Sequence, residues 1–154
     1  MDWGHTLAMI GIGIMVGLSG AGSAIGTAIG GASVLGMMKK RPDAFGSGLI
    51  LAVLPATQGL YGFVGFIIYN GVVTALGGGM TLLQGSVVLG AGIGLGVTAL
   101  ISAIQQGNVC ANGIAAIGSG HNVFANAMIL AVFPEFYAIL ALVAAILMRG
   151  VIGA

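Results

Sequence analysis

The sequence predicts an all-α membrane protein in which four transmembrane helices form two similar hairpins within a single membrane domain. Of its 154 residues, 58% are hydrophobic and only 5% are charged, whereas soluble domains carry about 25% charged residues. The chain also contains four apolar stretches, each longer than the roughly 20 residues that a helix needs to cross a bilayer. Its two halves resemble each other without a gap, which indicates a duplicated hairpin.

We expect the four helices over residues 6–38, 45–76, 82–117 and 122–148. Glycine-rich strings such as residues 77–79 mark the turns between them. The stretches are long and do not alternate between apolar and polar residues, which favours helices over barrel strands. The first stretch has no basic residue before it and exceeds signal-peptide length, so we expect it to be retained as a helix.

The first connecting loop sets the expected orientation. Lys39, Lys40 and Arg41 make it the only strongly basic loop, and basic loops tend to stay in the cytoplasm. We therefore expect a multi-pass protein of the cell membrane, with both hairpin loops cytoplasmic and both termini outside. Arg149, at the end of the fourth stretch, is a basic residue that opposes this orientation. It carries little weight, because its long side chain can reach the membrane surface from a helix end.

The repeat assigns residues 1–79 to a first hairpin and residues 80–154 to a second. The segment ILAVLP at 50–55 matches ILAVFP at 129–134, so equivalent residues are 79 positions apart. At this offset Ser23 matches Ser102 and Phe45 matches Phe124. Both hairpins would start outside and turn inside, which makes the duplication parallel and not inverted.

Glycines are concentrated in the first and third stretches. They recur at every fourth position over residues 22–30 and at every second position over residues 90–96. Small residues allow helix backbones to approach closely. These helices would therefore suit the inner layer of a curved assembly, with ordinary packing between membrane helices as the alternative.

The composition argues against several classes of function. A formal net charge of +1 without a basic patch gives nucleic acid no surface to bind. The single Cys110 allows no intrachain disulfide and lacks the Cys and His neighbours of a metal site, so we interpret it as apolar filler. No G-x-G-x-x-G motif is present, so the glycine clusters do not indicate a phosphate site.

Glu135 is the one charged residue away from the chain ends and the first loop. It lies midway along the fourth predicted helix, near the membrane midplane, where an ionised acid costs several kcal/mol. Such a residue usually serves a function, the alternative being a permanently protonated acid that hydrogen-bonds a neighbour. The first hairpin carries Ala56 at the equivalent position, so one carboxylate serves two hairpins.

Polar side chains are expected at the depth of Glu135. Counting from the loops places Gln58 and Gln106 within about 8 Å of that depth, at 1.5 Å of rise per residue. Thr57 and Tyr61 share a helix face with Gln58. Such residues can also simply hydrogen-bond neighbouring helices, but five polar groups at one depth favour a site.

Two prolines, Pro55 and Pro134, directly precede this group, and each frees a backbone carbonyl one turn earlier. A kink at either proline would expose backbone oxygen to a bound ion. Carboxylate, amide, hydroxyl and carbonyl oxygens are all hard ligands, which suit an alkali cation better than zinc or copper. One carboxylate with one monovalent cation is neutral overall. The ion-loaded site would therefore face lipid at a lower free-energy cost than the empty, charged site.

Three segments carry a family resemblance: LPATQGLYG at residues 54–62, Gln106 with Gly107, and PEFYAIL at residues 134–140. Together they resemble the K subunit, or proteolipid, of prokaryotic V-type (A-type) ATPases, over nearly the whole chain. The resemblance implies a homo-oligomeric membrane ring, the rotor, which carries cations past a stator subunit bearing an essential arginine. It also implies contact with the central stalk of a soluble motor and a non-catalytic role for this chain, which would bind no nucleotide.

The sodium-binding branch of that family implies a set of Na⁺ ligands here, with Tyr61 as the hydrogen-bond partner of Glu135. The implied ligands are the Leu54 carbonyl, Thr57, Gln58, Gln106 and Glu135. Glu135 alone would suffice for H⁺, which leaves protons as the alternative cargo. Phe133 and Pro134 stand before the acid where other members often carry different residues.

Two other classes of protein are alternatives to the ring. A small four-helix transporter would use Glu135 for proton-coupled export of a cationic drug and would line its cavity with aromatic side chains, such as Phe133, Phe136 and Tyr137. A purely structural membrane oligomer would leave the midplane acid unexplained. The repeated hairpin and the glycine-rich helices favour the ring.

Overall fold

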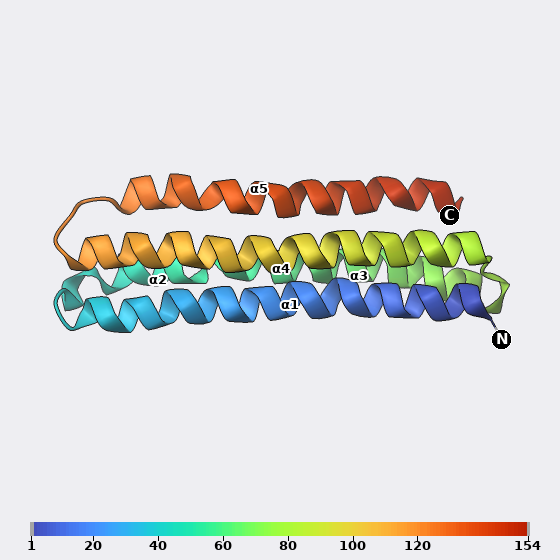
Figure 1. The fold of residues 1–154 in the computed structure, drawn as a ribbon, viewed down its shortest axis with the longest axis horizontal. Helices are drawn as coiled ribbons and strands as arrows, with labels where there is room; N and C mark the ends of the chain where they lie inside the picture. The colour runs from blue at the N-terminus through green and yellow to red at the C-terminus, as the bar shows by residue number, and fades with distance from the viewer. Residues whose placement is uncertain (1, 154) are drawn as a thin grey trace.

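The computed structural model describes residues 2–153, and four long helical spans run side by side through it (Figure 1). The first span is α1 (Trp3–Met38) and the third is α4 (Leu82–Gly118). The second consists of α2 (Phe45–Val53) and α3 (Thr57–Leu76), and the fourth is α5 (Phe124–Arg149). All four spans are long and apolar enough to cross a membrane, which confirms the predicted fold class.

Short 3₁₀ segments lie at the joints between these spans. They are Pro42–Ala44 after the first turn, Leu54–Ala56 between α2 and α3, Gly77–Gly79 after α3, and Gly150–Ile152 after α5. Gly77 has a φ of 48° and Gly120 a φ of 95°, a backbone conformation that glycine adopts without a steric penalty. These two glycines allow the chain to reverse at opposite ends of the bundle.

The starts of α1 and α4 are capped at equivalent positions of the repeat. The Asp2 side chain accepts a hydrogen bond from the His5 backbone N–H at 3.2 Å. The Thr81 hydroxyl accepts one from Gln84 N–H at 3.2 Å, and the Gln84 side chain accepts one from Thr81 N–H at 2.9 Å. Such caps satisfy N–H groups that have no partner within the helix. Local capping therefore follows the duplication.

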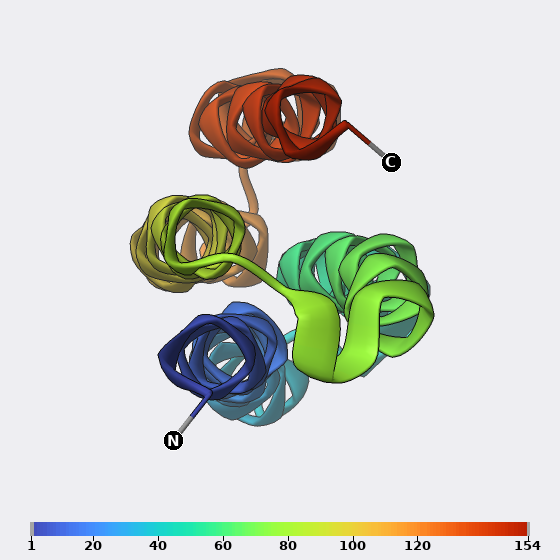
Figure 2. The same cartoon turned by 90° about the vertical axis from the view of Figure 1, so that its right-hand side faces the viewer.

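The four spans form a layered bundle in which both termini lie at one end (Figure 1). Seen end-on, α1 and α4 are neighbours, and α5 lies beyond α4 on the side away from α1 (Figure 2). Helix α3 packs against α1, α4 and α5. Near the terminal end, the buried Tyr69 hydroxyl of α3 donates to the Ala145 carbonyl of α5 at 2.5 Å.

Glycines hold α1 and α4 at very short range. A Cβ added to Gly22 would come within 2.6 Å of the Leu100 Cα, and one added to Gly107 within 2.7 Å of the Gly26 Cα. Real Cβ atoms do not approach backbone so closely, so these positions accept only glycine without movement of the helices. The predicted close approach of the glycine-rich helices is thus present within the chain.

The two equivalent prolines have different consequences. At Pro55 the second span changes to a 3₁₀ turn between α2 and α3, whereas α5 continues as an α-helix through Pro134. The chain therefore leaves α-helical geometry at the proline of the first hairpin and keeps it at the proline of the second. Beside Pro134, the Ser102 hydroxyl donates to the Pro134 carbonyl at 2.7 Å, so α4 contributes a hydrogen bond to the backbone at that point.

Candidate ion-binding site

Glu135 stands near the middle of α5, half-buried, and each of its carboxylate oxygens accepts a hydrogen bond. The Tyr61 hydroxyl of α3 donates to Oε1 at 2.7 Å. The Gln106 side-chain amide of α4 donates to Oε2 at 3.0 Å. Three helices therefore meet at this carboxylate.

Three oxygen atoms gather on the facing turn of the second span. The Thr57 hydroxyl lies 3.0 Å from the Leu54 carbonyl oxygen and 3.3 Å from Oε1 of Gln58. The Leu54 carbonyl belongs to the 3₁₀ turn that contains Pro55. The turn and the start of α3 thus bring one backbone oxygen and two side-chain oxygens close together.

Two fully buried amides join this oxygen cluster to Glu135. The Gln58 amide nitrogen donates to Oε1 of Gln106 at 2.8 Å. The Gln106 nitrogen donates both to Glu135 and, at 2.9 Å, to the Ala131 carbonyl of α5. All six residues named from the sequence thus belong to one connected hydrogen-bond network.

Ser102 of α4 is a further member of this network that the sequence reasoning did not name as a site residue. Its hydroxyl accepts from the Gln58 amide at 3.0 Å and donates to the Pro134 carbonyl at 2.7 Å. Its equivalent in the first hairpin, Ser23, accepts from the Gly59 backbone N–H at 2.7 Å. The signal was present in the sequence, because Ser23 and Ser102 match in the repeat and Ser102 precedes Gln106 by one helical turn.

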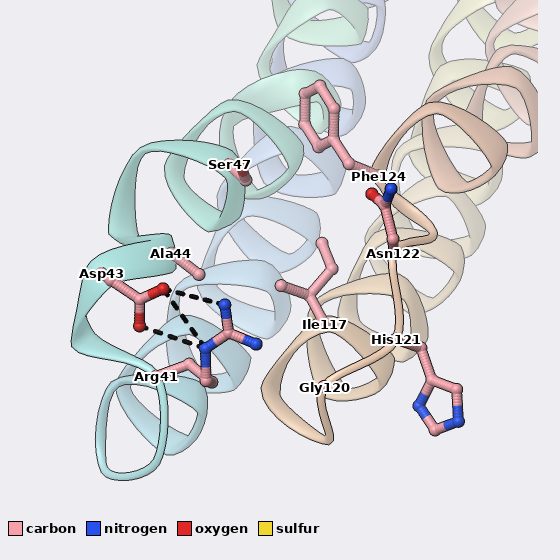
Figure 3. A pocket seen from close by; sticks show the side chains of 9 residues that line it. All are labelled: Arg41, Asp43, Ala44, Ser47, Ile117, Gly120, His121, Asn122 and Phe124. Carbon is pink, nitrogen blue, oxygen red and sulfur yellow. Dashed lines mark hydrogen bonds and ion pairs between the residues drawn. The ribbon is translucent and has the colours of Figure 1, made fainter.

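One groove lies beside the network, and another hollow lies at the hairpin turns. A groove of about 510 Å³ between α4 and α5 runs beside the network, and Ser102, Pro134 and Tyr137 are among its lining residues. Another hollow of about 340 Å³ lies between the two hairpin turns, far from Glu135 along the bundle. There Arg41 pairs with Asp43 at 2.8 Å, and His121 points away from that pair (Figure 3).

Comparison with known proteins agrees with the duplicated architecture. The family described as that of the ATP synthase C subunit matches residues 10–69 and again residues 89–148. These two matches begin and end at positions that the internal repeat makes equivalent. Both the first and the second hairpin therefore carry the family pattern.

Individual relatives match this chain across both hairpins. The A-type ATP synthase subunit K of Methanocaldococcus jannaschii is 37% identical over 92% of this chain, which spans only 61% of that protein. The V-type sodium ATPase subunit K of Enterococcus hirae is 37% identical over 94% of this chain and 91% of its own length. The 16 kDa proteolipid of the V-type proton ATPase of Ovis aries is 23% identical over 96% of this chain and 93% of its own.

Proposed function

The chain belongs to the ATP synthase C-subunit family, and from this premise we propose that it is a rotor-ring subunit of a V-type or A-type ATPase that carries Na⁺ across the membrane. It would be non-catalytic, coupling ion movement to rotation while the soluble motor hydrolyses or makes ATP. The observation that carries the proposal is the network around Glu135, a carboxylate in the middle of a membrane span that contacts polar groups of α3 and α4.

The oxygen cluster supports Na⁺ as the cargo. Hard oxygens bound to a cation such as Ca²⁺ lie about 2.3–2.6 Å from it, so neighbouring ligands lie about 3–3.5 Å apart. The Thr57 hydroxyl oxygen has this spacing from both the Leu54 carbonyl oxygen and Oε1 of Gln58. We propose that Na⁺ binds between them and Glu135, with Gln106 turning its amide oxygen towards the ion. Tyr61 would keep its hydrogen bond to the carboxylate.

Protons are the alternative cargo, because a single carboxylate suffices to carry one. The relatives include both a sodium ATPase subunit and proton ATPase subunits. The sodium ATPase subunit is the more similar of these two, at 37% against 23% identity. Together with the neutral oxygens, this similarity favours Na⁺.

The remaining partners follow from the ring assignment. The homo-oligomeric ring would pass Glu135 along a stator subunit that bears an essential arginine, within the lipid bilayer. The turns at Lys40 and Ser119 would face the cytoplasm and contact the central stalk of the soluble motor, and both termini would lie outside. The positive charge of Lys39, Lys40 and Arg41 supports this orientation.

A labelling experiment tests the site and the cargo together. A hydrophobic carbodiimide modifies a carboxyl group only when it is protonated, so bound Na⁺ should protect Glu135. Because Na⁺ and H⁺ compete for one carboxylate, the pH of half-maximal labelling should fall by about one unit per tenfold rise in Na⁺, once the site is saturable. Potassium should protect much less. Labelling that ignores Na⁺ at every pH would overturn the sodium proposal and leave protons as cargo.

The same assay tests the ligand set through Thr57→Val, which removes one oxygen while keeping the side chain's shape. A lost contact to a charge is worth about 1.5–3 kcal/mol, so protection should require roughly tenfold more Na⁺ or more. Protection at an unchanged Na⁺ concentration would remove Thr57 from the ligand set.

A proton-coupled four-helix transporter is the second candidate, because exposed aromatic side chains stand beside Glu135. Phe133 and Tyr137 are 63% and 64% exposed and line the 510 Å³ groove between α4 and α5. The two functions differ in assembly. The mass of the protein in mild detergent should be that of a large closed ring, and a monomer or dimer would favour the transporter.

A further inference from the structure

Ser23 of α1 contacts the backbone of the second span directly beside the proposed Na⁺ ligands. It is buried, and its hydroxyl accepts a hydrogen bond from the Gly59 backbone N–H at 2.7 Å. Gly59 follows Thr57 and Gln58 directly in the chain, and both of these residues belong to the proposed ligand set. Ser23 therefore acts on the backbone that carries the ligands and not on a ligand side chain.

Helix α3 begins without a side-chain cap of its own. It starts at Thr57, so its N-cap residue is Ala56, whose side chain has no oxygen to accept a hydrogen bond. The first N–H groups of a helix have no acceptor within that helix, and a capping side chain normally accepts from the second or third residue. Gly59 is the third residue of α3, and its N–H donates to Ser23. A side chain of α1 therefore takes the place of the missing N-cap.

The hydroxyls on either side of Ser23 along α1 bond to their own helix. Ser19 donates to the Met15 carbonyl at 2.7 Å, and Thr27 donates to the Ser23 carbonyl at 2.7 Å. Such bonds to the preceding turn are usual for Ser and Thr within helices. The Ser23 hydroxyl lies between them in the chain and accepts from a different helix. Its hydrogen bond therefore depends on how α1 and α3 pack.

Glycines bring α1 close enough to the second span for this contact. A Cβ added to Gly59 would lie 3.0 Å from the Ser23 Oγ and 3.2 Å from the Ser23 Cβ. One turn-length earlier, a Cβ added to Gly26 of α1 would lie 2.6 Å from the Cβ of the buried Pro55. Helix α1 thus lies directly against both the 3₁₀ turn and the start of α3, the two segments that hold the neutral oxygens.

The equivalent serine of the second hairpin makes a different contact. Ser102 donates to the Pro134 carbonyl at 2.7 Å, and α5 continues through that proline as an α-helix. No new helix begins at this depth of α5, so the second hairpin has no helix start to cap there. The two serines match in the repeat, but only Ser23 accepts from the start of a helix.

We propose that Ser23 is a positioning residue for Na⁺ binding. Its hydrogen bond caps α3 from α1 and keeps the Leu54, Thr57 and Gln58 oxygens in place before an ion binds. This inference rests on the proposed Na⁺-carrying function and adds to it a residue that does not touch the ion. Ligands that are already in place lose less conformational freedom on binding. Without the cap, Na⁺ binds only the fraction of molecules whose turn is correctly placed, and the apparent affinity falls by that fraction.

Carbodiimide labelling of Ser23→Ala in membranes tests this role. The Na⁺ concentration that half-protects Glu135 should rise roughly two- to fivefold, the effect on an equilibrium constant of losing a typical helix cap. Without Na⁺, the pH of half-maximal labelling should equal that of the wild type, because the carboxylate keeps its hydrogen bonds from Tyr61 and Gln106. A general loosening of the bundle would shift the Na⁺-free pH profile as well, so the two measurements separate positioning from a purely structural role.

Ser19→Ala is the matched control. The Ser19 hydroxyl is also buried and lies one helical turn from Ser23 on α1, but it donates only to Met15 of its own helix. Because such a bond contributes little to stability, the half-protecting Na⁺ concentration should change by less than about twofold.

Three results would overturn the positioning role while leaving Na⁺ transport standing. They are an unchanged Na⁺ requirement in Ser23→Ala, an equal response of Ser19→Ala, and a shifted Na⁺-free pH profile in Ser23→Ala. A wild-type protein that Na⁺ fails to protect would instead overturn the proposed sodium cargo, and the role of Ser23 in Na⁺ binding with it.

Discussion

At the scale of single residues, Glu135 carries the chemistry that its neighbours arrange. Its two oxygens accept from Tyr61 and Gln106, so the carboxylate is held in place from two helices. We predict that Glu135→Gln reduces ion transport to background, because an amide of the same volume cannot balance a cation or release a proton. Transport by the reconstituted complex is the measurement, and an unchanged ring mass is the control for assembly. Normal ATP-driven transport by this variant would refute the role of Glu135.

Ser102 has a supporting part that can be tested separately. Ser102→Ala removes the acceptor for the Gln58 amide and the donor to the Pro134 carbonyl. A neutral hydrogen bond is worth about 0.5–1.5 kcal/mol, so the Na⁺ needed for half-protection from carbodiimide should rise roughly two- to tenfold. Ser19→Ala is the matched control, since the buried Ser19 hydroxyl donates only to Met15 of its own helix. An equal response of the two variants would exclude a specific role for Ser102.

Most members of the network around Glu135 could be named from the sequence because their chemistry is unusual for a membrane span. A carboxylate, two glutamines and a threonine at one depth stand out against an apolar background, and counting along helices predicts depth well. Counting does not predict which amide atom meets which oxygen. Ser102 was missed because a serine in a membrane helix often bonds its own backbone, as Ser19 does. The packing of α4 against α3 and α5 shows that Ser102 hydrogen-bonds to both of these helices.

At the scale of helices, the predicted spans agree with the structure to within a few residues. The span predicted over residues 82–117 is α4, Leu82–Gly118. The second span, predicted as one helix, is divided at Leu54–Ala56. The same proline chemistry leaves α5 unbroken at Pro134, so proline alone does not determine a break. At Pro134 the backbone carbonyl accepts a hydrogen bond from Ser102 of α4, a contact between helices that the sequence does not reveal.

Close packing of α1 on α4 leads to a prediction about glycine. Gly22→Ala would place a Cβ 2.6 Å from the Leu100 Cα. Neither atom can move by a change of side-chain rotamer, so the two helices must separate. Overpacking of this kind typically costs about 1–3 kcal/mol, and the variant should unfold in denaturing detergent at a correspondingly lower temperature. Gly71→Ala on α3 is the control, because its Cβ would meet nothing within 4 Å. Equal stability of the two variants would contradict the close approach.

At the scale of the whole molecule, the two hairpins share a fold but divide the work. Capping at Asp2 and Thr81 and the starts of α1 and α4 follow the repeat. The polar side chains do not, since Glu135 stands opposite Ala56, and Gln58 and Tyr61 are matched by Tyr137 and Leu140. In the proposed site, one hairpin would therefore supply most of the neutral ligands and the other the charge. The proposal thus gives a single site per chain, formed between the hairpins.

The orientation of the whole molecule gives the last prediction. Lys40 and Ser119 line a common hollow of about 270 Å³ between the two hairpin turns, while Gly79 is exposed at the opposite end of the bundle. Because the basic turn favours the cytoplasm, Lys40→Cys and Ser119→Cys should react with a membrane-impermeant maleimide only in inverted vesicles, and Gly79→Cys only in intact cells. The native Cys110 is buried and should not react.

Binding of the soluble motor should then shield Lys40→Cys and Ser119→Cys and leave Gly79→Cys unaffected. Labelling of Lys40→Cys from outside would reverse the orientation, and equal labelling with and without the motor would separate these turns from the stalk contact.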